Sequence, residues 1–210
     1  MASKILVDEL APYSHATDVT LATGKKIAGA NTQYKVTGGA SGQLLTNDGS
    51  DGLSWSTVPP TIKHTVLCEQ QVSGTDGGTF TSGAWRIRTL NNEIFDDIGV
   101  SIAGDQQFTI PAGTFYIKWR CPGYGVYRHM TRLYDVTNGV VKEYGTSQFD
   151  QLSTANDVGW SFGWAKVIVA SATEYQIEHQ CSNTRATEGF GQSADFSVEK
   201  YTVVEIEQHA

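Results

Sequence analysis

The segment that decides the fold is TFYIKWRC, residues 114–121, in which apolar and polar side chains alternate. Successive side chains of a β-strand point to opposite faces, so this alternation predicts a strand with one buried face. The side chains expected to point inward are Phe115, Ile117, Trp119 and Cys121, and those expected to point outward are Tyr116, Lys118 and Arg120.

The same period of two recurs on both sides of this segment, and no stretch has a helical period. Further strands are expected at residues 62–68, 84–90, 98–102, 106–110, 124–134, 158–170, 174–181 and 195–207. Within 158–170, Trp160, Phe162, Trp164 and Ile168 share one face. Asn138-Gly139 predicts a hairpin with a two-residue turn between 133–136 and 140–144. The fold class is therefore all-β, with eight to ten short strands in a sandwich.

Composition bounds the function. The chain has 210 residues, 40 % of them hydrophobic and 18 % charged, with a net charge of −7, which is enough apolar material for a core. No basic block is present, so we expect no capture of nucleic acid. No apolar run reaches the ~20 residues of a membrane span, and the first residues do not resemble a secretory signal, so we expect a soluble protein without membrane insertion.

The three cysteines, Cys68, Cys121 and Cys181, are widely spaced and odd in number. Cys121 and Cys181 continue the inward faces of their strands, so we expect free, buried thiols. A disulfide between two of the three is the alternative.

Residues 1–60 differ from the rest, because their apolar residues come in bursts too short to form a core. We expect an extended arm or an intertwined trimeric stalk, with Pro59-Pro60 as a stiff boundary before a sandwich at residues 61–210. A loose leader is the alternative. The residues expected to anchor this arm on a particle are Ile5, Leu6, Val7, Val19, Leu21 and Trp55.

Residues 39–55, GASGQLLTNDGSDGLSW, resemble the GxxGQxLTxDGxxxxW element of bacteriophage tail-fibre and virion-appendage proteins. The segments before it, around Ile5-Leu6-Val7 and Val19-Thr20-Leu21, resemble the opening of many such proteins. The resemblance implies a structural protein of the virion, assembled in the host cytoplasm, that forms a trimer with an attachment or decoration role.

A second resemblance covers the remainder of the chain. Residues 107–117, QFTIPAGTFYI, are similar to the FxxPxxGxYxF strand pair of C1q and tumour-necrosis-factor-like jelly rolls, and residues 201–206, YTVVEI, resemble the last core strand of phage versions. That family implies a jelly-roll homotrimer with aromatic residues on the threefold faces. Carried onto this chain, the interface candidates are Tyr124, Tyr127, Trp160 and Trp164.

No catalytic pattern emerges. Residues 39–43, GASGQ, miss the spacing of a GxSxG nucleophile motif by one residue, and no two histidines have the spacing of zinc ligands. We therefore expect no enzyme, no cofactor and no metal site, with an ion on a threefold axis left open. The residues that could contact a host glycan or protein are Phe190, Tyr124, Tyr127, Arg128 and His129, against the alternative that they belong to the core and the subunit interface.

These observations predict a trimeric surface fibre or capsid decoration protein of a phage. It would dock on other virion proteins by residues 1–60 and present jelly-roll heads for adhesion. The alternatives are a receptor-binding tail fibre or spike, a glycan-degrading enzyme on a jelly-roll scaffold and a free lectin-like protein.

Overall fold

The computed structural model describes residues 40–41, 43–47, 53–57, 62–149 and 157–209, in two parts that are treated separately. The first part is an antiparallel hairpin of β1 (Gln43–Asn47) and β2 (Leu53–Thr57), in which Leu45 pairs with Trp55. The second part is a β-sandwich. The described residues contain no helix with the length and apolarity needed to cross a membrane.

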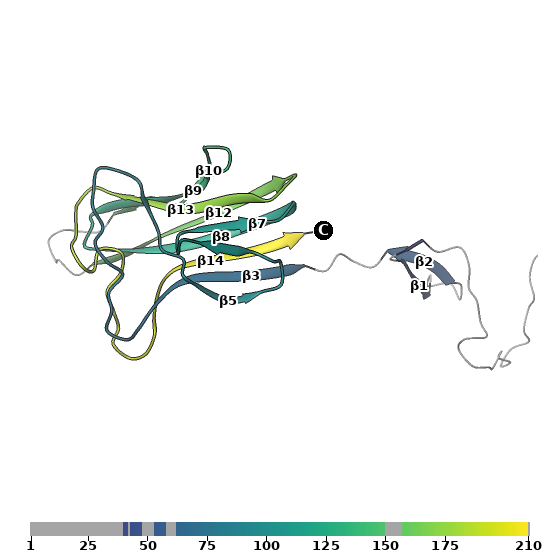
Figure 1. The fold of residues 1–210 in the computed structure, drawn as a ribbon, viewed down its shortest axis with the longest axis horizontal. Coiled ribbons are helices and arrows are strands. Elements are labelled where there is room, and N and C mark those ends of the chain that lie inside the picture. The colour runs from purple at the N-terminus through teal and green to yellow at the C-terminus, as the bar shows by residue number, and fades with distance from the viewer. Residues whose placement is uncertain (1–39, 42, 48–52, 58–61, 150–156, 210) are drawn as a thin grey trace, which may run out of the picture. The chain divides into compact units, whose positions relative to one another are not determined.

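Two antiparallel sheets form the sandwich (Figure 1). One sheet contains β3 (Lys63–Gln71), β5 (Asn92–Asp96), β8 (Gly113–Tyr124), β12 (Val158–Val169) and β14 (Glu199–His209), in the order β12-β8-β14-β3-β5. The other contains β4 (Arg86–Ile87), β6 (Ser101–Ala103), β7 (Gln107–Ile110), β9 (Arg128–Asp135), β10 (Val140–Tyr144), β11 (Gln148–Phe149) and β13 (Thr173–Cys181), with the main order β10-β9-β13-β7-β6.

The chain crosses repeatedly between the two sheets, and its first and last sandwich strands, β3 and β14, pair with each other (Figure 1). Eight strands, four in each sheet, make a jelly roll: β3, β8, β12 and β14 in one sheet and β7, β9, β10 and β13 in the other. The expected all-β jelly-roll sandwich is therefore confirmed.

The core lies between the sheets and follows the predicted alternation. Phe115, Ile117, Trp119 and Cys121 of β8 are buried, whereas Tyr116, Lys118 and Arg120 are exposed. Other strands of both sheets contribute further apolar side chains, chiefly Leu67, Phe108, Leu133, Val167, Tyr175, Ile177, Val204 and Ile206. All three cysteines are free and buried, as the sequence predicted.

Several strand limits differ from the prediction for local reasons. The expected strand at 124–134 is broken before β9, because Gly125 and Tyr127 adopt left-handed backbone conformations with φ of 60° and 71°. The turn after β9 spans four residues, 136–139, instead of two, and the Asp135 carboxylate accepts hydrogen bonds from the backbone and side chain of Asn138.

The last strand and the strand at 84–90 also differ. β14 begins at Glu199, four residues after the predicted start, because the Glu199 carboxylate holds residues 194–195 in a loop by accepting their backbone N–H groups. At 84–90 only Arg86–Ile87 remains in a ladder.

The side chain of Trp119 packs closely against Gly163 and reaches from one sheet to the other. Gly163 of β12 pairs with Trp119 of β8, and a Cβ at Gly163 would overlap the indole ring of Trp119. The indole lies over Gly163, and its Nε1 donates a hydrogen bond of 2.8 Å to Oγ1 of Thr131 on the opposite sheet. The absence of a side chain at position 163 therefore allows one indole to join both sheets.

We predict that Gly163→Ala lowers the free energy of unfolding by about 1–3 kcal/mol, the usual effect of overpacking a core. Lys166→Ala, an exposed position on the same strand, should change it by no more than about 0.5 kcal/mol. Chemical denaturation followed by tryptophan fluorescence measures both. Equal stability of the two variants would show that Trp119 has room to move.

Candidate functional site

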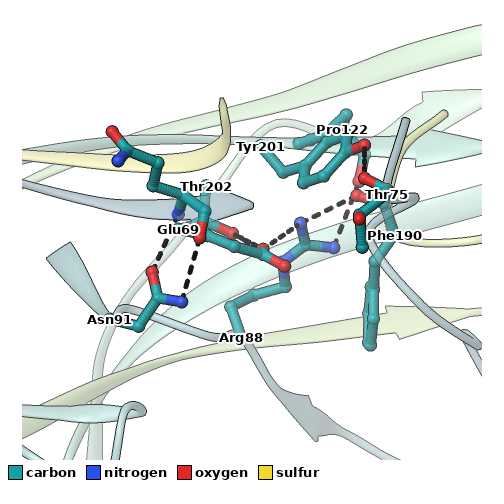
Figure 2. A network of polar contacts seen from close by, with 9 residues as sticks. Glu69, Thr75, Arg88, Asn91, Pro122, Phe190, Tyr201 and Thr202 are labelled. Atoms are coloured by element: carbon teal, nitrogen blue, oxygen red, sulfur yellow. Dashed lines mark hydrogen bonds and ion pairs between the residues drawn. The ribbon is translucent and has the colours of Figure 1, made fainter. Parts of the chain in front are cut away.

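A buried arginine joins the two sheets near one end of the sandwich. The backbone N–H of Arg88 donates to the carbonyl of Ile177 in β13, while its fully buried guanidinium reaches the other sheet (Figure 2). It donates to Thr202 Oγ1 at 2.8 Å, to the Pro122 carbonyl at 3.3 Å, and from Nη2 to both the Phe190 carbonyl at 2.9 Å and Glu69 Oε2 at 3.4 Å. These bonds satisfy a charge that would otherwise be costly to bury.

Glu69 is the only carboxylate that forms an ion pair with Arg88 among the described residues. Burial raises the pKa of Glu69 above its usual value, although the neighbouring Arg88 charge acts in the opposite direction. Desolvation is therefore the larger effect at this carboxyl group, and the arginine charge offsets part of it.

Two loops are tied together beside this ion pair. Phe80 and Arg185 exchange backbone hydrogen bonds of 2.9 and 3.0 Å, and the Phe80 ring stacks on Phe190 at 4.3 Å between ring centroids. The guanidinium of Arg88 lies 4.2 Å from the centre of the Phe190 ring. Phe190, named from the sequence as a candidate contact residue, is half-buried in this cluster.

Two histidines lie next to the same cluster. Nδ1 of His129 and Nε2 of His179 are 2.9 Å apart, and both side chains are buried. Burial, followed by the Arg88 charge, lowers the pKa of His129 to about 4 and lowers the pKa of His179 well below its ordinary value. Both imidazoles are therefore neutral at physiological pH.

The buried thiols are also unreactive as nucleophiles near neutral pH. Burial raises the pKa of Cys121 to about 12 and that of Cys181 to about 11, so both are protonated near neutral pH. Among the described residues, no three His, Cys, Asp or Glu side chains gather as metal ligands would.

An open groove of about 710 Å³ lies on the sheet that contains β9, β11 and β13. We call it the β9–β11 groove; its lining residues are Ser82, Gly83, Trp85, Arg128, His129, Met130, Ser147, Gln148, Phe149, Gln180, Cys181 and Ser182. Strand pairing brings the lining residues together, because β9 pairs with β11 on one side and with β13 on the other.

The contact residues predicted from the sequence do not form one site, but lie at the groove, at the end of β8 and in the Arg88 cluster. Arg128 is exposed at the β9–β11 groove, where His129 also lies but is buried, and Tyr127 is half-buried and touches the ring of Phe149. Tyr124 is buried at the end of β8, and Phe190 belongs to the Arg88 cluster. The groove residues Trp85, Gln148 and Phe149 were not singled out from the sequence.

A second surface lies on the outer face of β8 and β12, here called the β12 face. Trp164 is 67 % exposed, Ile168 is 73 % exposed and Phe162 is 45 % exposed, and all three point the same way. Beside them is a hollow of about 510 Å³ that extends to Lys118, Arg120, Val203 and Glu205. Trp160, on the same face as predicted, is half-buried.

The predicted anchoring residues Ile5, Leu6, Val7, Val19 and Leu21 lie outside the described residues. Trp55 is half-buried in β2. Its anchoring role stays a prediction.

No protein-family model matches the chain, and no curated protein matches it. Similar solved structures include the globular domain of zebrafish complement 1qA protein, with 14 % identity, a TM-score of 0.43 and coverage of 71 % of this chain and 96 % of that one. Another is Eiger TNF from S. frugiperda, with 8 % identity, a TM-score of 0.48 and coverage of 73 % and 94 %. Murine APRIL at pH 5.0 has 8 % identity, a TM-score of 0.49 and coverage of 70 % and 99 %. The jelly roll is assigned from the strand order above.

We predict that Arg88→Met lowers the free energy of unfolding at pH 7 by about 3–5 kcal/mol, because it leaves Glu69 buried without its counter-charge. The pKa of Glu69 in the folded variant should rise further, so stability should be lost as the pH increases through that value. The deficit relative to the original protein should therefore be smaller at pH 5 than at pH 7.

The double variant Glu69→Gln, Arg88→Met is the control, since it removes the titrating carboxyl. The free energy of unfolding of the double variant should therefore change less between pH 5 and pH 7 than that of Arg88→Met. Denaturant titrations at pH 5 and pH 7 test this, and a deficit of Arg88→Met that does not change with pH would contradict the account.

Proposed function

We propose that this protein is a trimeric structural protein of a bacteriophage virion, attached to the particle through residues 1–60 and presenting its jelly roll for adhesion. The observation that carries the assembly is the β12 face, where large apolar side chains stand in solvent on the outer side of a well-packed sheet. Contiguous exposed apolar surface of this kind usually marks an interaction site.

The chemistry of the β12 face favours a copy of the same chain as its partner. Aromatic residues at its centre are bordered by Lys118, Arg120 and Glu205, which gives the apolar core and charged rim of a protein–protein interface. Because charges of both signs border this face, its rim can pair with charged groups of either sign on a neighbouring copy. We infer three chains in the oligomer, because residues 107–117 resemble a segment of C1q and TNF-like trimers.

The virion role rests on residues 39–55. Their described strands, β1 and β2, form a five-pair hairpin with Leu44 and Leu53 exposed, a small unit with little core of its own. An isolated two-stranded hairpin is marginally stable in water, which supports a role in which it is covered by sister chains or by the particle.

Adhesion would then work through many weak contacts. Three heads on one base, and many bases on one particle, raise the effective concentration of each head near a surface after the first has bound. A strong single site and a chemical reaction are both unnecessary for this function.

We predict that the protein is found in purified virions of the phage that encodes it, and that deletion of residues 1–58 abolishes its incorporation while the jelly roll stays folded. Mass spectrometry of density-purified particles measures incorporation, and circular dichroism of the truncated protein checks folding. A full-length Trp55→Ala variant serves as the milder control and should reduce incorporation partially.

If the full-length protein is missing from purified particles, the virion role is wrong. If the truncated jelly roll still decorates them, residues 1–58 are not the anchor.

A further inference from the structure

The β9–β11 groove is built from residues that suit a small polar ligand with ring faces. Two aromatic side chains, Trp85 and Phe149, line it together with the hydroxyls of Ser82, Ser147 and Ser182 and the amides of Gln148 and Gln180. Its volume of about 710 Å³ lies in the usual range of small-molecule sites. Apolar ring faces with a few placed donors and acceptors match a saccharide, which has C–H faces and a rim of hydroxyls.

The charge of the groove is positive, which favours an anionic ligand. Among the described residues that line the groove, Arg128 alone carries a formal charge at neutral pH, since the buried His129 is neutral there and none of the others is a carboxylate. The chain as a whole carries a net charge of −7, so a positive group here is a local exception. None of the ion pairs found in the described part of the chain involves Arg128.

Arg128 is also held in place. Its backbone N–H donates to Ser182 Oγ at 3.1 Å, and its carbonyl accepts from the Ser182 N–H at 2.9 Å. Its guanidinium lies 5.3 Å from the centre of the Tyr127 ring and 5.8 Å from that of Phe149. An arginine held beside two rings loses less freedom on binding an anion than a free one.

The backbone next to Arg128 supports this reading. Tyr127 has φ of 71°, a left-handed conformation that is unfavourable for a bulky side chain. This conformation allows the Tyr127 ring to pack at 4.8 Å from Phe149, at the edge of the groove. Strained backbone of this kind tends to occur where a side chain must be held for function.

The groove and the β12 face belong to opposite sheets of the sandwich. Assembly through the outer face of β8 and β12 therefore does not require the surface of β9, β11 and β13.

We propose that the β9–β11 groove binds an acidic saccharide, with the carboxylate of a uronic or similar sugar on Arg128 and a sugar ring against Phe149. The guanidinium presents a planar pair of N–H donors that matches a carboxylate, and the neighbouring hydroxyls and amides pair with the sugar hydroxyls. This inference deepens the adhesion part of the proposed function, but it concerns the isolated protein and does not depend on which particle carries it.

The test uses labelled full-length protein on an array of bacterial oligosaccharides, followed by titration of a matched pair, cellobiuronate and cellobiose, which differ by one carboxylate. Ligand-observed NMR measures both dissociation constants. We expect the bound glycans on the array to be the carboxylated ones, and cellobiuronate to bind about tenfold more tightly than cellobiose.

Variants assign the site. Arg128→Gln should remove the preference for the acidic sugar, and Phe149→Ala should weaken both sugars. Lys142→Gln, which removes the same charge from an exposed position on β10 outside the groove, should change neither. Thermal unfolding of each variant checks that the fold is intact.

The proposal is overturned if no acidic glycan binds, if acidic and neutral glycans bind equally, or if acidic binding survives both Arg128→Gln and Phe149→Ala. A protein that binds acidic sugars through Arg128 yet is absent from virions would support the groove and reject the virion role. A protein that is found in virions but does not bind acidic sugars through Arg128 would reject the groove proposal and leave the virion role intact.

Discussion

The constraint on which the structure depends is that β12 carries apolar side chains on both of its faces. Ala165 and Val167 point into the sandwich, and Phe162 and Trp164 point away from it. A strand of this composition is typical of a sheet covered on two sides, whereas one jelly roll covers only one. The inner face packs within the single chain, and in our proposal another copy of the chain covers the outer face.

The two sheets therefore have different surfaces and, in our account, different roles. The sheet of β8 and β12 presents exposed aromatic side chains of β12 beside charged groups, whereas the sheet of β9 and β13 presents hydroxyls and amides around the β9–β11 groove. Arg88, which directly follows β4, holds the two together near one end, where its guanidinium donates to acceptors on the opposite sheet (Figure 2). Since that guanidinium also binds the carbonyl of Phe190, the order of the loops at this end depends on a buried charge.

Strands with clear alternation could be predicted from sequence, because period two reports directly on burial. The faces of 114–121, the buried thiols and the shared face of Phe162 and Trp164 are of this kind. The candidate site was predictable only in part. Arg128 stands out in the sequence, but Trp85 and Phe149 join it through strand pairings between distant segments. Arg88 resembles an ordinary strand charge, and its burial follows from the topology that places Glu69 and Thr202 beside it.

The mass of the full-length protein in dilute solution tests the central claim most directly, because it shows whether the β12 face is covered. Light scattering or native mass spectrometry at micromolar concentration should give three times the chain mass of 22.8 kDa, and Phe162→Ser combined with Trp164→Ser should shift the protein towards single, folded chains. A sharp 22.8 kDa species for the unaltered protein would mean that these aromatic side chains are stable in water, and the account of assembly would be wrong.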